Sequence, residues 1–142
     1  MTSKSIFGLT LIMAMLFVGC LAADRSVTDS NGTSATVQTQ LFGDWSGESI
    51  CQVKNSPCHD EKVVYHISKG DTPDLVVIDA DRIVDGKAQN MGKIDFKYDA
   101  KAKTLVSDSY GHWVFYIKDN KMDGTLTNAD GTLFRKVSLT KV

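Results

Sequence analysis

Cys51 and Cys58 are the residues of this chain whose type and spacing most directly indicate chemistry. Six residues separate them, including the turn-prone segment Asn55-Ser56-Pro57, so a hairpin would bring the two thiols side by side. A pair of cysteines in an exported domain usually forms a disulfide. A redox pair or a metal site is a weaker alternative, because the spacing is not that of a C-x-x-C motif and only His59 lies near. The sequence therefore predicts a disulfide that fixes the register of a hairpin.

The third cysteine, Cys20, lies in an N-terminal segment with the layout of a secretory signal peptide. Lys4 carries positive charge, and residues 6–18 form an uncharged, mostly apolar run that is too short to span a bilayer of about 30 Å as a helix. Residues 16–20 (LFVGC) resemble a bacterial lipobox, in which the cysteine becomes lipidated. Cleavage by an ordinary signal peptidase after residue 22 or 23 is the alternative. We expect residues 1–22 to be a signal peptide, with a lipid anchor where Cys20 is modified.

Residues 23–40 predict a flexible linker between this segment and a folded domain. They are rich in serine, threonine, aspartate and asparagine and have no apolar period, so they cannot bury enough surface to fold. The predicted organisation is thus a signal peptide, a disordered polar linker over 23–40 and a folded domain over 41–142. It predicts export to the bacterial periplasm or cell envelope, with contact to the membrane only through a lipid anchor. Without that anchor the protein would be secreted.

The remaining candidates for acid–base or metal chemistry are scattered. His59 precedes Asp60 and Glu61, but neighbouring residues of a strand point to opposite faces and loop residues splay apart. His66 lies inside an apolar strand, where it is either a hydrogen-bonded core residue or a ligand contact. His112 is predicted at the start of a strand. No serine lies in a G-x-S-x-G context, and no glycine loop is of the phosphate-binding type. The sequence therefore predicts no enzyme, no metal site and no cofactor.

The balance of charge and the choice of acids indicate the type of element that must position these residues. The chain has 17 aspartates plus glutamates against 16 lysines plus arginines, which disfavours a nucleic-acid binder. Fifteen of the acids are aspartate and only two, Glu48 and Glu61, are glutamate. Aspartate prefers turns and caps, whereas glutamate tolerates helix interiors. The composition therefore favours short strands and turns over a helical bundle.

Alternating hydrophobicity predicts eight strands. The alternation is clearest where Ile94, Phe96 and Tyr98 interleave with charged residues. Asp119-Asn120 and Asp130-Gly131 are typical hairpin turns. The predicted strands are 44–53, 62–68, 75–79, 93–99, 103–107, 112–118, 121–127 and 132–140. Strands this short, joined in sequence order, predict an all-β, antiparallel up-and-down eight-stranded barrel. Residues 80–92 fit a helical turn, a bulged strand or a long loop.

Gly43-Asp44-Trp45 at the start of the first strand resembles the G-x-W motif of lipocalins and other calycin-like barrels. In that family a tryptophan from the first strand plugs one barrel end, and a basic residue near the last strand lies across the indole. The resemblance implies that Arg135 packs over Trp45. The domain is shorter than a typical lipocalin and has no predicted C-terminal helix. It is most similar to small lipocalin-like secreted proteins and lipoproteins of bacteria, many of them uncharacterised.

Two functions follow from such a barrel, because eight strands either enclose one small ligand or are filled by their own side chains. The first is the binding of a small apolar or amphipathic ligand in the cell envelope. Its candidate contacts are residues of the second, fourth and sixth predicted strands: Tyr65, His66, Phe96, Tyr98, Trp113 and Phe115. The second is an envelope-tethered module that binds or inhibits a partner protein and holds no small molecule.

Overall fold

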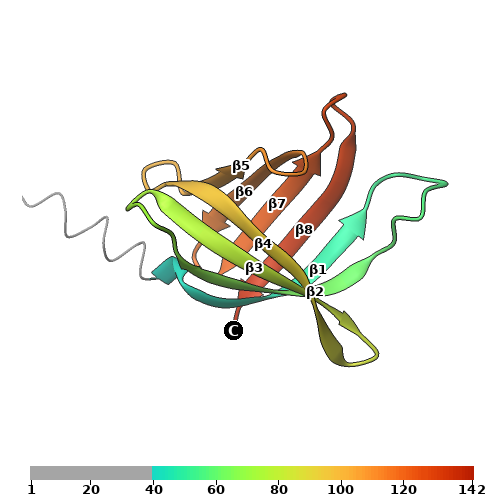
Figure 1. Cartoon of the computed structure of the whole chain (residues 1–142), viewed down its shortest axis with the longest axis horizontal. Helices are drawn as coiled ribbons and strands as arrows, with labels where there is room; N and C mark the ends of the chain where they lie inside the picture. Colours follow the sequence, from blue (N-terminus) through green and yellow to red (C-terminus); the bar gives the residue numbers. More distant parts are fainter. Residues whose placement is uncertain (1–39) are drawn as a thin grey trace, which may run out of the picture.

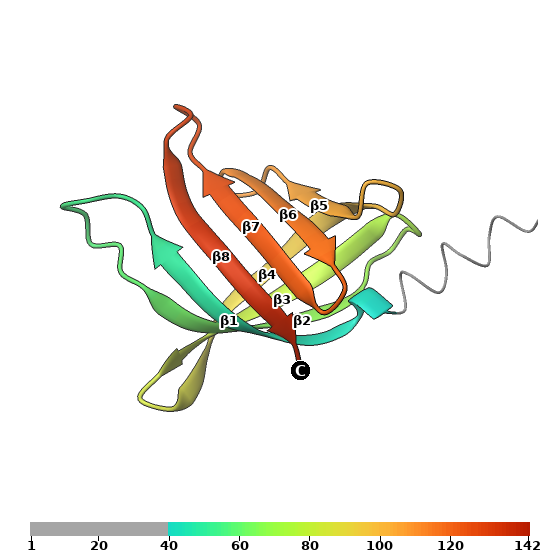
Figure 2. The same ribbon diagram turned by 180° about the vertical axis from the view of Figure 1, so that it is seen from behind.

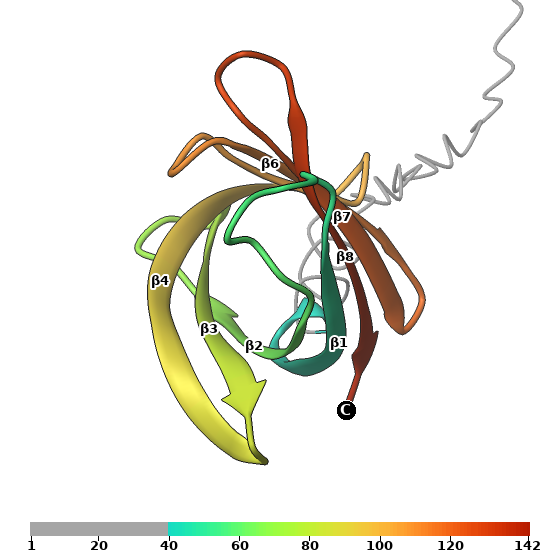
Figure 3. The ribbon, with the colours of Figure 1, turned by 90° about the vertical axis from the view of Figure 1, so that its right-hand side faces the viewer.

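The computed structural model describes residues 40–142, which form a barrel of eight strands (Figures 1 and 2). The strands are β1 (Gly43–Cys51), β2 (Glu61–Lys69), β3 (Leu75–Val84), β4 (Lys87–Asp99), β5 (Thr104–Ser107), β6 (His112–Lys118), β7 (Lys121–Thr127) and β8 (Leu133–Lys141). Each strand pairs antiparallel with the next, and β8 pairs with β1 to close the barrel (Figure 3). This confirms the predicted fold class. The predicted signal peptide, with Cys20, and residues 23–39 of the predicted linker lie outside the described residues.

Residues 80–92 form the ends of β3 and β4 and the turn between them, so the bulged strand was the correct alternative. Asp85 and Gly86 both have positive φ angles, 50° and 75°, as a two-residue type I′ turn requires. The pairing of β3 with β4 shifts register between Ala80 and Asp81, and Gly92 has a φ of 106° on the facing strand. The end of this hairpin projects away from the barrel (Figure 1).

Aspartates mark several of the other corners. Asp99 Oδ1 accepts hydrogen bonds from the backbone N–H groups of Lys101 and Ala102, both at 2.9 Å. Asp130 Oδ1 accepts one from Thr132 N–H, also at 2.9 Å. These side chains satisfy backbone donors that the sheet leaves unpaired at a turn. The turn role expected for Asp130 is confirmed.

Leu41 and Trp45 close one end of the barrel. The indole of Trp45 is completely buried, and its Nε1–H donates to the Leu41 carbonyl at 2.9 Å. Lys141 Nζ lies 5.7 Å from the centroid of the Trp45 ring and donates to the Phe42 carbonyl at 2.8 Å. The last strand therefore holds a cation over this tryptophan.

The expected contact between Arg135 and Trp45 is wrong. Because β1 and β8 run antiparallel, the start of β8 faces the end of β1. Arg135 is accordingly paired with Cys51, whereas Lys141 is paired with Trp45. Arg135 lies toward the opposite end of the barrel, where its side chain takes part in the cavity described below.

The Cys51–Cys58 disulfide is confirmed, with the two Cα atoms 5.9 Å apart. It joins the end of β1 to the loop that leads to β2. Asp60 Oδ1 supports the same corner by accepting a hydrogen bond from Cys51 N–H at 2.9 Å. A disulfide of this kind is typical of proteins that fold in an oxidising, exported environment. In residues 40–142, no helix is long and apolar enough to cross a membrane.

Candidate ligand cavity

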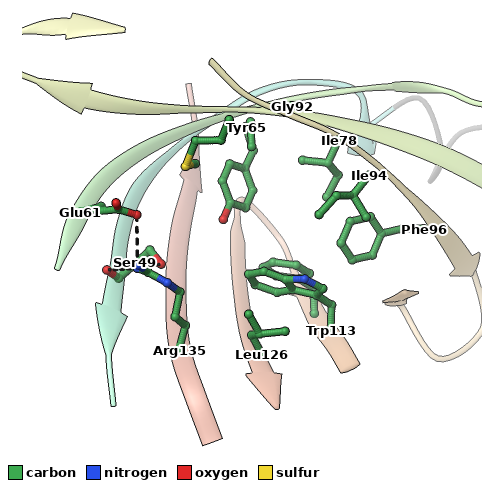
Figure 4. Close-up of a pocket in the computed structure, with 13 residues that line it drawn as sticks. Ser49, Glu61, Tyr65, Ile78, Gly92, Ile94, Phe96, Trp113, Leu126 and Arg135 are labelled. Atoms are coloured by element: carbon green, nitrogen blue, oxygen red, sulfur yellow. Dashed lines mark hydrogen bonds and ion pairs between the residues drawn. The ribbon is translucent and has the colours of Figure 1, made fainter. Parts of the chain in front are cut away.

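A cavity of about 260 Å³ lies inside the barrel (Figure 4). Its lining includes Ser49 near the end of β1 and Arg135 near the start of β8, whereas Trp45 lies near the start of β1, so the cavity lies toward the end opposite Trp45. Met91 lines it and is 45% exposed, so it marks the mouth. Most lining residues come from alternate positions of a strand, because only every second side chain faces inward; Met91 and Gly92 are neighbours at the register shift of β4. The full set is Ser49, Glu61, Tyr65, Ile78, Ala80, Met91, Gly92, Ile94, Phe96, Trp113, Phe115, Leu126 and Arg135.

Four aromatic rings line the cavity, and Phe115 contacts the other three. Trp113 stacks on Phe115 with ring centroids 5.7 Å apart and an interplanar angle of 7°. Phe96 and Tyr65 meet the same ring edge-on, at 5.7 Å and 6.2 Å. Such contacts hold each ring in place and present flat apolar surfaces to the cavity.

Gly124 explains why the large Phe115 ring leaves space in the barrel. A Cβ atom on Gly124 would lie 2.2 Å from Cδ1 of Phe115, so the ring lies directly against the backbone of β7. The two residues are cross-strand partners of β6 and β7. The absent side chain thus lets Phe115 lie close to the wall.

One wall of the cavity is polar and is formed by Ser49, Glu61 and Arg135. Arg135 Nη1 donates to Ser49 Oγ at 3.0 Å and lies 3.3 Å from Glu61 Oε2. The side chains of Arg135 and Glu61 are only 15% and 11% exposed. Arg82 Nη1, outside the cavity lining, lies 3.5 Å from the other Glu61 oxygen. The charges of Glu61 and Arg135 therefore compensate each other within the wall.

The hydroxyl of Tyr65 points into the cavity, between this polar wall and the Trp113 indole (Figure 4). Burial raises the pKa of Tyr65 to about 12; Arg135 opposes that rise and Glu61 adds to it. Because this pKa is far above neutrality, the side chain is an uncharged phenol at physiological pH. It can therefore donate one hydrogen bond and accept others.

Four of the six predicted ligand contacts line this cavity, namely Tyr65, Phe96, Trp113 and Phe115. His66 does not, because alternation along β2 turns it to the face opposite Tyr65. Its Nδ1 lies 2.7 Å from Asp44 Oδ1, its Nε2 lies 3.3 Å from Asp81 Oδ2, and its side chain is 42% exposed.

Tyr98 is also outside the cavity. It is buried at the end of β4, near Leu41 at the closed end of the barrel. The predictions that His66 and Tyr98 line one site with the other four residues are therefore wrong.

Within residues 40–142, no group of three or more histidine, cysteine, aspartate or glutamate side chains is placed to hold a metal ion.

Sequence reasoning missed the polar wall. Glu61 lies two and four residues before Val63 and Tyr65, so period-two alternation already places it on the inward face of β2. Ser49 shares the inward face of β1 with Trp45. A carboxylate on an inward face needs a basic partner. This requirement could have predicted that a basic residue such as Arg135 pairs with Glu61.

No protein-family model and no curated protein matches this chain. Among solved structures, an odorant binding protein, OBP1, is similar at 12% sequence identity and a TM-score of 0.48. The match covers 72% of this chain and 71% of that chain.

Proposed function

We propose that this barrel binds one small apolar or amphipathic ligand in its cavity. The observation behind the proposal is the space of about 260 Å³ between four aromatic side chains and a compensated polar wall. Ligand pockets commonly measure roughly 300–1,000 Å³, so this one suits a compact molecule. A cavity of about 150 Å³ accommodates benzene, which has six non-hydrogen atoms. At the same volume per atom, the cavity of about 260 Å³ accommodates a ligand of about ten non-hydrogen atoms.

The alternative function, a filled barrel that only binds or inhibits a partner protein, has less support. It requires the large inward side chains to occupy the interior. Trp113 and Phe115 instead stack on each other, and Phe115 lies against Gly124. The remaining space favours a ligand over a filled core.

The proposed setting is outside the cytoplasm, in the periplasm or cell envelope of a bacterium, and the proposed role is binding rather than catalysis. The signal-like residues 1–22 and the Cys51–Cys58 disulfide support export. Modification of Cys20 would tether the protein to a membrane, and cleavage after residue 22 or 23 would release it. A protein partner in the envelope is compatible with either form.

Binding of naphthalene, an uncharged fluorescent probe of about ten non-hydrogen atoms, tests this function. We expect saturable binding at one site. Ala80→Leu adds three carbons to the cavity lining and should weaken binding about tenfold or more, a loss of about 1.4 kcal/mol. Ala88→Leu is the matched control, since Ala88 is exposed on the projecting end of β4. Absence of binding to the wild type, or equal binding to Ala80→Leu, would overturn the proposal.

A further inference from the structure

We infer that the ligand is a compact uncharged molecule with an apolar body and one hydrogen-bond acceptor, such as a carbonyl oxygen, and that the Tyr65 hydroxyl binds this acceptor. The inference rests on the proposed function and adds the class of ligand and the residue that recognises its polar group.

The Tyr65 hydroxyl is a polar group that faces the cavity and has no hydrogen-bond partner within residues 40–142. Tyr65 is only 6% exposed, and its oxygen points into the cavity rather than out to solvent (Figure 4). In the described part of the chain, no group forms a hydrogen bond with this oxygen; the contact of Tyr65 with Phe115 is made by its ring. Buried tyrosine hydroxyls usually have a partner, so a ligand atom is the natural candidate.

Two further residues of the same lining carry donors that have no partner among the described residues. Trp113 Nε1 is the one fully buried side-chain nitrogen or oxygen in residues 40–142 that lacks a hydrogen-bond partner. The polar contacts of Arg135, to Ser49, His59 and Glu61, all use Nη1. Its Nε and Nη2 therefore have no partner in the described structure.

The polar lining thus has more donors than acceptors. An indole N–H and a guanidinium can only donate, and the phenol donates as well as accepts. The acceptors of the wall, Glu61 and Ser49, are already bonded to arginine side chains. A ligand that supplies an acceptor satisfies this excess, whereas a pure hydrocarbon leaves the donors unpaired.

The charges of the lining favour a neutral ligand. Glu61 and Arg135 are the charged members of the lining, and they compensate each other at 3.3 Å. Arg82, the second cation near Glu61, is 40% exposed and hence partly screened by water. A charged ligand would lose its hydration without gaining an unpaired countercharge.

A matched set of three ring compounds with the same number of non-hydrogen atoms tests the inference. Acetophenone carries a carbonyl, α-methylstyrene replaces the carbonyl oxygen by a CH₂ group, and benzoate carries a charge. We expect the wild type to bind acetophenone about fivefold more tightly than α-methylstyrene, which is the range of one neutral hydrogen bond, and to bind benzoate most weakly. Dissociation constants are measured by displacement of naphthalene.

Tyr65→Phe removes only the hydroxyl and should abolish the preference for acetophenone, while binding of α-methylstyrene and naphthalene stays unchanged. Tyr98→Phe is the matched control, because Tyr98 is a buried tyrosine outside this cavity. Retained naphthalene binding also reports that each variant is folded.

The outcomes separate this inference from the proposed function. If the wild type binds naphthalene but does not prefer the ketone, the acceptor class is wrong and ligand binding stands. If benzoate binds most tightly, the neutral class is wrong. If the ketone is preferred but Tyr65→Phe keeps that preference, Tyr65 is not the recognising residue. If neither naphthalene nor any of the three compounds binds, the proposed function itself fails.

Discussion

Arg135 and Glu61 show at the level of single residues how a polar pair can be accommodated inside a barrel. Removing two charges from water is costly, and an ion pair recovers that cost only when its remaining groups are also bonded. Here Glu61 is shared between Arg135 and Arg82, and Arg135 Nη1 also donates to Ser49 Oγ. The two side chains are therefore paired within the wall of the cavity, and they are among the features that set the polarity of the site.

His66 lies on the outside of the barrel and has a testable effect on stability. The hydrogen bond that His66 donates to Asp44, opposed by desolvation and aided by Asp81, raises the pKa of His66 above its usual 6.5. A raised pKa in the folded state means that protonation stabilises the fold. This stabilisation is fully present below a pH of about 6.5 and is lost as the pH rises through the higher pKa of the folded state.

We therefore expect His66→Gln to lower the free energy of unfolding at a pH of about 5.5, by less than about 1 kcal/mol because the histidine is substantially exposed. The difference from the wild type should vanish by a pH of about 8.5. Urea unfolding at both pH values measures it. Asp44→Asn, which removes the larger cause of the shift, should show the same pH dependence. A difference that grows with increasing pH would contradict this assignment.

At the level of elements, the β3–β4 hairpin is the part of the fold that the hydrophobic pattern of the sequence could not predict. Its ends carry polar residues on both faces, so neither the period of a strand nor that of a helix is visible. The side chain of Asn90 holds the bulge by donating to Asp79 at 2.7 Å and to Asp81 at 2.9 Å. Asp79 and Asp81 therefore both bind Asn90, and this contact could be predicted only with the register between β3 and β4 known.

Gly124 controls how closely Phe115 packs on the sheet. Because Gly124 has no side chain, the Phe115 ring of β6 lies directly against the backbone of β7. Gly124→Ala should lower the free energy of unfolding by about 1–3 kcal/mol, the usual cost of overpacking. It should also weaken naphthalene binding, since the displaced ring can move only into the cavity. Thermal or urea unfolding and the naphthalene titration measure the two effects.

The partner of this variant is Phe115→Leu, which removes the ring that the new methyl group would strike. In the double variant, the added cost of Gly124→Ala should be smaller than in the wild-type background, a coupling that a double-mutant cycle quantifies. If the two costs simply add, Phe115 is not what restricts position 124.

At the level of the whole molecule, strand order and barrel closure follow from alternation and short turns, which are local signals. Which residues of the first and last strands face each other does not follow from such signals, because it depends on a register that no local pattern specifies. This is why Trp45 could be placed at a strand start from its motif, whereas its cation was taken to be Arg135 rather than Lys141. The same limit applies to the cavity. Its aromatic residues could be named from the sequence, but the length of β4 places Tyr98 at the other end.

The arrangement of the two barrel ends makes a prediction about the tethered protein. Gln40, the first residue described, lies at the closed end, where its carbonyl accepts a hydrogen bond from Lys141 Nζ. The cavity mouth at Met91 lies toward the other end. The predicted linker therefore joins the domain at its plugged end. A flexible segment of about 20 residues has a mean reach of roughly 25 Å, so a lipid at Cys20 would leave the mouth free of the membrane.

We accordingly expect the wild type expressed in a bacterial host to remain in the membrane fraction, from which detergent releases it. Cys20→Ser should shift it to the soluble fraction, since this thiol is the predicted lipid acceptor. Both forms should bind naphthalene with the same affinity, because the predicted linker joins the domain at the end away from the cavity mouth. Ser34→Ala, in the predicted linker, controls for substitution in this segment. A wild type that is soluble from the outset would overturn the lipid anchor. Tighter binding by the soluble form would show instead that the membrane obstructs the mouth.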